Sequence, residues 1–505
     1  MRKEYVGYQL EEQRRKAKYA LRAATRSKRL VKLLIATLLL IVLWNVPATW
    51  FGMGALTVVE QRTIAVFCFA TLMWILEAVP AWNTSVTIIV IMLFCFSDSS
   101  LSFLNAGYGA EELGSLLSHK KVMACFADPI IMLFIGGFIL AIAATKSGLD
   151  VKLAKVMLKP FGTKSENVLL GFILVTGLFS MFLSNTATAA MMLTFLAPVL
   201  KSLPANGKGK ICLALAIPIG ANIGGIGTPI GTPPNAIALK FLNDPEGLNM
   251  NIGFGQWMLF MFPLALVLLL LAWRILLILF PFTQKTIELN IEEQKEKKLL
   301  PWQDKLVYIV FIITILLWMT DKLSGVNSNV VAMLPVGAFC LGGIITRTDL
   351  EEINWSVLWM VAGGFALGVA LQDTGLASHI IETIPFNTWS PILMIVGSGL
   401  LCYAMANFIS HTATANLLVP ILAMAGISAA ENLAAFGGVS TLLIGVALGS
   451  SLAMVLPIST PPNALAHATG LIEQKQMMRV GLIMGIVGLA LGYTMLIFVG
   501  KAGLL

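Results

Sequence analysis

The feature that most limits the fold of this chain is a long series of apolar segments, each about as long as a membrane-spanning helix. A helix needs about 20 apolar residues to cross a bilayer, and such segments fill most of the 505 residues. Only 12% of the residues are charged, whereas soluble domains carry about 25%. The sequence therefore excludes a soluble enzyme, a nucleic-acid-binding protein and a disordered protein. We predict an all-α polytopic membrane protein in contact with the lipid bilayer.

Eleven of these segments are expected to span the membrane. They lie near residues 33–52, 63–80, 83–103, 129–148, 211–240, 256–282, 305–322, 330–346, 354–376, 439–467 and 479–500. Two more, 166–200 and 386–424, are interrupted in the middle by polar residues. We interpret these two as re-entrant hairpins, which enter and leave the membrane on the same side. An odd number of spans places the two termini on opposite sides.

The basic residues orient these spans. Residues 1–34 hold eleven Lys and Arg against three Glu, which accounts for the whole net charge of +8. Positive segments next to membrane spans stay in the cytoplasm and attract anionic lipid. The loops around Lys152, Lys208 and Arg347 agree with this rule. We predict a cytoplasmic N-terminus, an extracytoplasmic C-terminus and a location in the plasma membrane.

No motif of the chain points to enzyme chemistry. The six cysteines are scattered singly in or beside apolar segments, so they indicate neither a zinc site nor a disulfide framework. The sequence contains no Gly-x-Ser-x-Gly or His-Glu-x-x-His motif and no pair of membrane aspartates. We expect no enzyme activity and no cofactor.

The chain also repeats itself. Residues 134–138 recur at 361–365, 184–189 at 410–415 and 231–238 at 459–466, with offsets of 227, 226 and 228. The fourth and ninth spans are five crossings apart, and because five is odd the two halves must be inverted relative to each other. Inverted repeats with interrupted helices at matching positions are typical of secondary transporters, whose substrate site lies at the repeat interface.

Each repeat carries a Thr-Pro-Pro-Asn turn inside a long apolar segment, at residues 232–235 and 460–463. Proline interrupts a helix, and Thr followed by Pro is also a helix start, with Thr as cap. We therefore predict two broken helices whose second halves begin at membrane depth. Their free N–H groups and positive dipole ends suit an anion.

The two hairpins carry polar triplets at their expected tips. Ser184-Asn185-Thr186 and Ser410-His411-Thr412 are each followed by Ala-Thr-Ala. Irregular backbone at membrane depth persists only where protein or a wet cavity satisfies it. Hydroxyl, amide and N–H groups can bind carboxylate oxygens, and hydroxyl and carbonyl oxygens can bind Na⁺. The alternative is a purely structural role, in which these small polar residues only hold helices together.

The paired triplets, each followed by a Thr-Pro-Pro-Asn turn, resemble the divalent anion/sodium symporter (DASS) family over about residues 55–500. The resemblance implies a homodimer whose protomers each have a scaffold domain and a transport domain that moves as an elevator. It implies di- or tricarboxylate substrates, such as succinate, malate, fumarate, 2-oxoglutarate or citrate. It also implies a substrate site built from both halves, at Asn185, Thr186, Thr232, Ser410, His411, Thr412, Thr460 and Pro461.

Sodium-coupled relatives have one Na⁺ site per triplet, with a hydroxyl residue four positions before the triplet's Ser. The first half fits this pattern and predicts a residual Na⁺ site at Ser180, Ser184, Asn185 and Gly231. In the second half Asn is replaced by His411, and the hydroxyl position is Ala406. Imidazole is a poor ligand for a hard cation, so we expect the second cation site to be lost and His411 to bind substrate instead.

These expectations give a domain plan. A basic cytoplasmic segment, 1–32, precedes scaffold helices at 33–128, and the first repeat, 129–282, contains the first hairpin and broken helix. A charged cytoplasmic linker, 283–304, and scaffold helices, 305–353, lead to the second repeat, 354–505. Glu77, near the end of the second span, is expected to cap a helix or to pair at an interface.

The function that fits best is Na⁺-independent exchange of small dicarboxylate anions. Na⁺-coupled symport is the main alternative, because the first cation site keeps its residues, and an anion channel is a third reading. The preferred carboxylate, the exchange stoichiometry and coupling to one Na⁺ or a proton stay open.

Overall fold

The computed structural model of the chain describes residues 29–54, 56–201, 203–204, 207–245, 247–287 and 299–503. Within these ranges the named elements are all helices, and extended backbone pairs only in two isolated bridges. The prediction of an all-α polytopic protein is confirmed. Most of the basic segment 1–32 and the centre of the linker 283–304 lie outside the described residues.

Eight helices of the described chain are long and apolar enough to cross a membrane. They are Val58–Leu76, His119–Ser147, Ser165–Phe182, Phe254–Leu279, Pro301–Met319, Trp355–Asp373, His411–Ser428 and Gln474–Lys501. Five shorter apolar helices accompany them, at Ala81–Phe96, Asn185–Leu200, Ser328–Leu341, Leu393–Phe408 and Gly438–Ser451. Further helices occupy 29–45, Lys208–Gly225 and Pro233–Leu242, so each predicted span and hairpin contains helix, and the number of eleven crossings stays a prediction.

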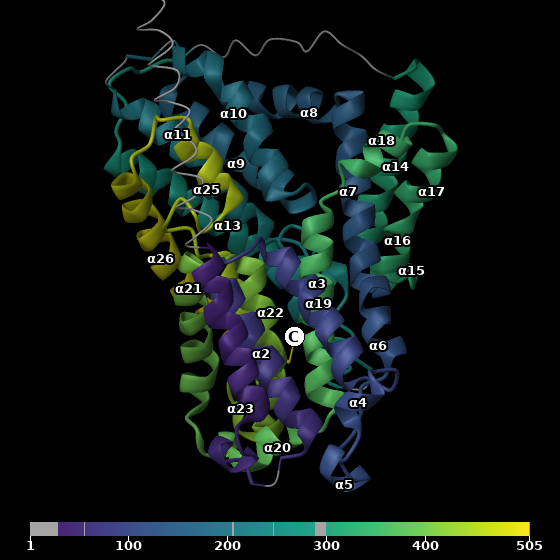
Figure 1. Cartoon of the computed structure of the whole chain (residues 1–505). Coiled ribbons are helices and arrows are strands. Elements are labelled where there is room, and N and C mark those ends of the chain that lie inside the picture. The colour runs from purple at the N-terminus through teal and green to yellow at the C-terminus, as the bar shows by residue number, and fades with distance from the viewer. Residues whose placement is uncertain are drawn as a thin grey trace, which may run out of the picture. The chain divides into compact units, whose positions relative to one another are not determined.

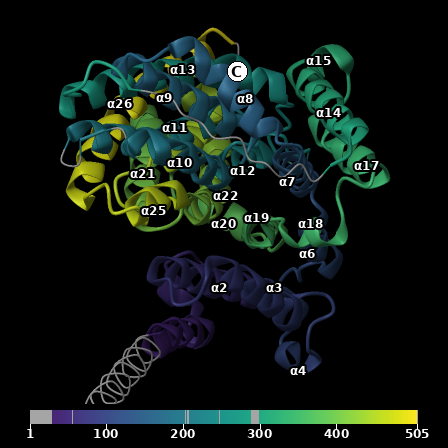
Figure 2. The same cartoon turned by 90° about the horizontal axis from the view of Figure 1, so that it is seen from above.

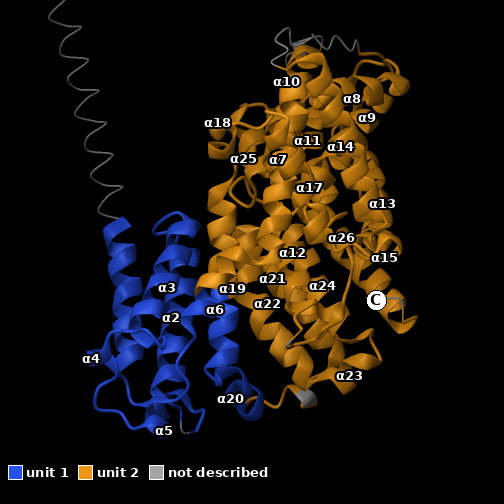
Figure 3. Ribbon diagram, turned by 90° about the vertical axis from the view of Figure 1, so that its right-hand side faces the viewer, with its two compact units in different colours: residues 1–122, 366–383 blue, residues 123–365, 384–505 orange. Residues whose placement is uncertain are grey.

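The described residues form two compact units, shown in different colours in Figure 3. Unit 1 holds the chain up to Val122 together with Ala366–Thr383. Its main elements are a helix over 29–45, α2 (Val58–Leu76), α3 (Ala81–Phe96) and α20 (Leu376–Thr383). Thr57 and Glu60 form a capping box at the start of α2. Exposed Glu77 ends α2 in the left-handed conformation, which agrees with the capping role expected for it.

Unit 2 holds Met123–Phe365 and Ile384–Leu505, apart from the residues outside the described ranges. It starts with α7 (Pro129–Ser147) and α8 (Leu149–Leu158), and it also contains α13 (Phe254–Leu279), α14 (Pro301–Met319), α17 (Met333–Leu341) and α26 (Gln474–Lys501). In Figures 1 and 2, α14 and α17 lie side by side, and both contact α7. The long helix α19 (Trp355–Asp373) starts in unit 2 and ends within the residues of unit 1.

The predicted hairpins and broken helices are all found in unit 2. The first hairpin is α9 (Ser165–Phe182) and α10 (Asn185–Lys201), and the second is a π-helical turn, Leu393–Gly397, with α21 (Ser398–Phe408) followed by α22 (His411–Ser428). The first broken helix is α11 (Lys208–Gly225) and α12 (Pro233–Leu242), and the second is α24 (Gly438–Ser451) and α25 (Pro461–Ala468). The helices of each hairpin pack on each other.

Helices α11 and α24 form the centre of unit 2. Every residue of α24 from Val439 to Ser451 is buried, and so is almost all of α11. Each approaches the first arm of its own hairpin through glycine: Gly224 lies against the backbone of Gly177, and Gly449 against that of Gly399. A side chain at Gly224 or Gly449 would overlap that backbone, so each hairpin is packed closely, backbone to backbone, on the broken helix of its own repeat.

The two repeats interlock. The second arm of the first hairpin, α10, packs on α25 of the second repeat, and the second arm of the second hairpin, α22, packs on α12 of the first. This exchange is the packing expected of two repeats related by an approximate two-fold axis. It brings the second arm of each hairpin against the second part of the other repeat's broken helix.

Candidate functional site

The break in each broken helix is held by the asparagine of its Thr-Pro-Pro-Asn turn. Buried Asn235 donates from Nδ2 to the carbonyl oxygens of Gly225, Ile226 and Thr228, at 3.1, 3.2 and 2.8 Å. Buried Asn463 donates to those of Met454 and Leu456, at 2.8 and 3.0 Å. These amides satisfy carbonyls that the break leaves without helical partners. The sequence prediction missed this role, although an Asn at the same buried position of both turns is a usable signal.

The two turns differ in how their threonines cap the following helix. Thr460 precedes α25, and its Oγ1 accepts a hydrogen bond from the backbone N–H of Asn463 at 3.2 Å. This is the cap that was predicted. Thr232 has the extended backbone of an N-cap before α12, but its side chain accepts no capping hydrogen bond. The prediction of a side-chain cap at Thr232 is wrong, and α12 is started by Pro233 and the Asn235 bonds.

The first triplet gathers the residues predicted to bind Na⁺. Ser180 Oγ donates to Asn185 Oδ1 at 2.6 Å. A Cβ built on Gly225 would lie 2.7 Å from Asn185 Oδ1 and 3.0 Å from the carbonyl oxygen of Gly231. Hydroxyl, amide and carbonyl oxygens are thus concentrated beside the break of the first helix, and oxygen ligands of this kind suit a hard cation. Ser184 Oγ instead accepts from the N–H of Ala187 at 3.2 Å.

The second triplet has a different arrangement. Ser410 Oγ caps α22 by accepting from the N–H of Ala413 at 3.1 Å. Buried His411 lies with Nε2 2.6 Å from the carbonyl oxygen of Ala453. Because a carbonyl only accepts, Nε2 carries the hydrogen. Ala453 occupies the position in the second repeat that Gly225 occupies in the first, at an offset of 228. Ala406, also buried, offers no hydroxyl.

The remaining predicted site residues are distributed between the surface and the interior. Thr232, Thr412 and Thr460 are buried, whereas Thr186 and Pro461 are exposed. Within the described part of the chain, no hydrogen bond joins the residues predicted from the first half directly to those predicted from the second. The halves meet through the packing of α10 on α25 and of α12 on α22.

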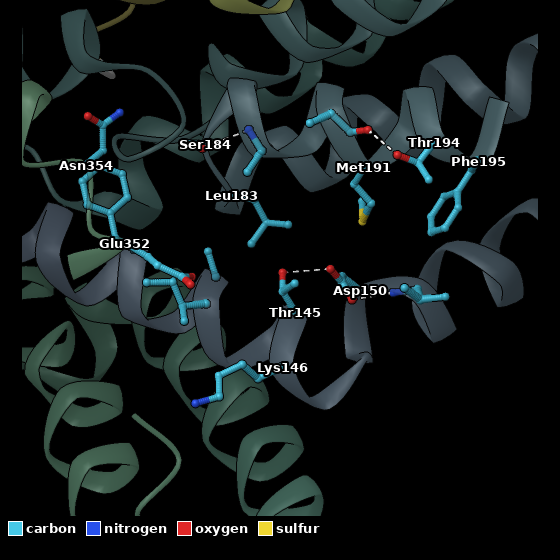
Figure 4. A pocket seen from close by; sticks show the side chains of 16 residues that line it. Thr145, Lys146, Asp150, Leu183, Ser184, Met191, Thr194, Phe195, Glu352 and Asn354 are labelled. Carbon is cyan, nitrogen blue, oxygen red and sulfur yellow. Dashed lines mark hydrogen bonds between the residues drawn. The ribbon is translucent and has the colours of Figure 1, made fainter. Parts of the chain in front are cut away.

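A cavity of about 470 Å³ lies beside the first hairpin tip (Figure 4). Ser184, Met191 and Thr194 form one wall, and α7 with Asp150 of α8 forms another. Thr145 donates to Asp150 at 2.9 Å, and burial raises the pKa of the Asp150 carboxyl. Of the residues predicted to bind substrate or Na⁺, only Ser184 is among those that line the cavity.

One of the residues that line this cavity, Lys146, forms an ion pair. Lys146, at the end of α7, donates from Nζ to Asp349 and to the carbonyl oxygen of Ile344, both at 2.7 Å. Burial acts to raise the pKa of Asp349, but hydrogen bonds from Lys146 and Thr346 leave it below its ordinary value. Asp349 therefore stays ionised and fixes Lys146. No group of three His, Cys, Asp or Glu able to hold a metal ion occurs among the described residues.

A known protein family matches nearly the whole chain. Residues 27–502 match the family model described as the sodium:sulfate symporter transmembrane region. The chain belongs to this family, the divalent anion/sodium symporters. The resemblance drawn from the paired triplets and turns is confirmed. As a member of this family the protein is a multi-pass membrane transporter and not an enzyme.

Several curated relatives of this family member match most of its length. An uncharacterised transporter of Haemophilus influenzae is 31% identical over 452 residues, which cover 86% of this chain and 90% of the relative. The sodium-dependent dicarboxylate transporters SdcS of Staphylococcus saprophyticus and Staphylococcus aureus are 30% identical over 453 and 456 residues. In both cases the match covers 83% of this chain and 82% of the relative.

Two solved transporter structures resemble the fold. Neisseria gonorrhoeae MtrF, from a class of antimetabolite efflux pumps, aligns over 83% of this chain and 94% of its own, with a TM-score of 0.53. Alcanivorax borkumensis YdaH aligns over 84% and 98%, with a TM-score of 0.55. Each is 12% identical to this symporter-family chain, so the likeness concerns the fold alone.

Proposed function

We propose that this protein is a secondary transporter that exchanges dicarboxylates across the plasma membrane without needing Na⁺. The observation that carries the proposal is the bond from His411 Nε2 to the carbonyl oxygen of Ala453, at 2.6 Å. In the first half, the equivalent residue Asn185 leaves its amide oxygen among hydroxyl and carbonyl oxygens. In the second half, a ring N–H already occupies the carbonyl that a cation would need.

The substrate class follows from the helix starts and from the relatives. Helices α22 and α25 begin with capped N-termini beside buried hydroxyls, and such ends favour anions. Two relatives are named as dicarboxylate transporters. A dianion that leaves water needs compensating charge or hydrogen bonds, because an uncompensated charge costs several kcal/mol or more. The proposed site supplies hydroxyls, helix N-termini and the His411 ring.

Exchange, rather than net uptake, follows because His411 is part of the carrier and, unlike a bound cation, cannot leave with the substrate. The only hydrogen-bond partner of its ring within the described chain is the Ala453 carbonyl oxygen, and no described carboxylate forms an ion pair with it. A bound dicarboxylate would stabilise the protonated ring. When the substrate leaves, the ring must keep an unpaired buried charge or release a proton that no neighbouring side chain accepts. The empty carrier therefore crosses slowly, and the loaded carrier crosses readily.

The two hairpins support an elevator-like movement. Asn416 of α22 donates to the carbonyl oxygen of Met360 at 2.7 Å, and Gly364 of α19 lies directly against the Asn416 side chain. At the equivalent place of the first repeat, a cavity separates α10 from α7. The second hairpin therefore contacts α19, whereas a cavity separates the first hairpin from α7. This difference between the halves is expected of one of the two end states of a moving carrier. We propose the scaffold and transport domains of the domain plan, and a homodimer, as the assembly that moves.

Na⁺-coupled symport is the second candidate, because one observation favours it. Ser180, Asn185 and Gly231 keep their oxygens together beside the first break, and the named relatives are sodium-dependent. One remaining Na⁺ could couple uptake through this site.

Counterflow in proteoliposomes tests the proposal. Vesicles loaded with unlabelled succinate should accumulate external labelled succinate in Na⁺-free buffer. Malate, fumarate, 2-oxoglutarate and citrate should be tried as competitors, with sulfate and monocarboxylates as controls. Accumulation blocked by dicarboxylates supports the proposal. Accumulation only in the presence of Na⁺ would favour the symporter, and no accumulation of any dicarboxylate would contradict both.

A further inference from the structure

A buried asparagine joins the two repeats at the second broken helix. Asn222 of α11 is 1% exposed, and its Nδ2 lies 3.2 Å from Thr460 Oγ1 and 3.1 Å from Asn463 Oδ1. Asn222 belongs to the first repeat and both partners belong to the turn of the second. Asn222 is not among the residues predicted to bind substrate or Na⁺.

The orientation of the Asn222 amide is fixed by its neighbour. Asn463 Nδ2 donates to two carbonyl oxygens, of Met454 and Leu456. Its Oδ1 therefore points toward Asn222 as an acceptor, and the Asn222 atom that faces it must be the nitrogen. The amide group has two hydrogens on that nitrogen, so the second is available for Thr460 Oγ1. The Asn222 oxygen makes no hydrogen bond within the described chain.

This arrangement determines what the Thr460 hydroxyl can still do. A hydroxyl has one hydrogen to donate and two lone pairs that accept. Both lone pairs of Thr460 are used, one by Asn222 Nδ2 at 3.2 Å and one by the N–H of Asn463 at 3.2 Å. The hydroxyl can then act only as a donor. A donor at the start of α25 suits a carboxylate oxygen and is unsuited to a cation.

The Thr-Pro-Pro-Asn turn of the first repeat has no such contact from the other half. The residue equivalent to Asn222 is Ser450, at an offset of 228, and its side chain is shorter. Asn235 Oδ1, the equivalent of Asn463 Oδ1, is buried and has no partner in the described chain. Thr232 receives no capping bond from α12. The Asn222 contact therefore sets one half of the site apart from the other.

We propose that Asn222 is a positioning residue that holds the Thr460 hydroxyl as a hydrogen-bond donor to one carboxylate of the substrate. The inference rests on the proposed function and adds the group that orients the substrate. One end of a dicarboxylate would bind at Thr460, and the site would recognise that end by its charge.

The test uses Asn222→Asp and Asn222→Ala in full-length protein in proteoliposomes. A carboxylate at position 222 accepts but cannot donate, so it would draw the Thr460 hydrogen away from the substrate. We expect Asn222→Asp to raise the KM for succinate exchange about tenfold or more, the effect of losing one hydrogen bond to a charged group. Asn222→Ala should raise KM less, because the hydroxyl then becomes free to turn. Ser450→Ala, at the equivalent buried position, is the control and should leave KM unchanged.

Two further readouts separate positioning from a structural effect. The substitution weakens only the interaction of Thr460 with one carboxylate. Succinate should therefore lose more affinity than its half-amide succinamate, which can place its uncharged amide there. In a Thr460→Val background, Asn222→Ala should change KM less than about twofold, since coupled residues are non-additive. If Asn222→Asp yields no folded protein, the same KM comparisons are made with Asn222→Ala.

The outcomes are distinct. Wild-type KM in both Asn222 variants, or an equal rise in the Thr460→Val background, would overturn the assignment while leaving the proposed function intact. Wild-type vesicles that exchange no dicarboxylate would overturn the proposed function and this assignment with it.

Discussion

Two residues at equivalent positions, Asn185 and His411, give the two halves of the site different chemistry. The Asn185 amide oxygen accepts a hydrogen bond from Ser180, whereas the His411 ring donates to the Ala453 carbonyl oxygen. The identity of both residues and the absence of a hydroxyl at Ala406 could be taken from the sequence, because the repeats align without gaps at the triplets. The Ser180 partner of Asn185 was also predicted, but the Ala453 partner of His411 was not, because Ala453 lies 42 residues later, on the linker between α24 and α25.

The first prediction is made at this residue scale. The double substitution Ala406→Ser with His411→Asn rebuilds the residue types of the first cation site in the second half. We expect labelled succinate uptake by this variant to be stimulated by Na⁺ about fivefold or more, which is the usual range of coupling between two sites. The measurement is uptake with Na⁺ or with choline outside the vesicles.

The single variant Ala406→Ser is the control for that experiment. It adds the hydroxyl but keeps the His411 ring on the linker carbonyl, so its uptake should stay independent of Na⁺. Equal uptake by the double variant in Na⁺ and choline would show that His411 does not stand in the place of a cation.

At the scale of helices, the sequence predicted the breaks but only part of what stabilises them. Paired prolines located both interruptions, and α12 and α25 start at Pro233 and Pro461. Local sequence also implied identical caps, yet only Thr460 accepts one. Both breaks are also stabilised by contacts of Asn235 and Asn463 with linker carbonyls up to ten residues earlier in the chain, which the sequence did not predict. Such contacts form only after the helix has bent back on itself.

The second prediction compares two equivalent glycines on α7 and α19. Gly364 lies against the Asn416 side chain, and a Cβ there would overlap it. A Cβ at Gly137 would meet only Ile230, at 3.6 Å. We expect Gly364→Ala to lower the free energy of unfolding by about 1–3 kcal/mol through overpacking, and Gly137→Ala to change it little. Thermal unfolding in detergent measures both, and equal stability of the two variants would contradict the packing described for the second hairpin.

At the scale of the whole molecule, the internal repeat carried most of the predictive information. Three motifs at nearly one offset predicted the hairpins, the broken helices and their pairing across the halves, which the packing of α10 on α25 and α12 on α22 matches. The repeat could not predict where the halves differ in packing. The cavity beside α10 and the close contact of α22 with α19 occupy equivalent places, so symmetry alone would make them the same.

The third prediction concerns the sidedness of the two hairpins. Asn167 and Glu431 are both exposed, near the base of the first and second hairpin. If the repeats are inverted in the membrane, cysteine at Asn167 reacts with an impermeant thiol reagent only from the cytoplasm. Cysteine at Glu431 then reacts only from outside. The native cysteines, of which Cys340 is exposed, are first replaced by serine. Reaction of both positions from the same side would exclude the inverted topology.

The central claim, that the carrier crosses readily only when loaded, is tested most directly by efflux. Proteoliposomes loaded with labelled succinate are diluted into buffer that contains unlabelled succinate, or Na⁺ without succinate, or neither. We predict rapid loss of label with external succinate in the absence of Na⁺, and slow loss in the other two buffers. Loss of label into succinate-free buffer at the rate seen with succinate would contradict the account, because the empty carrier would then return as fast as the loaded one.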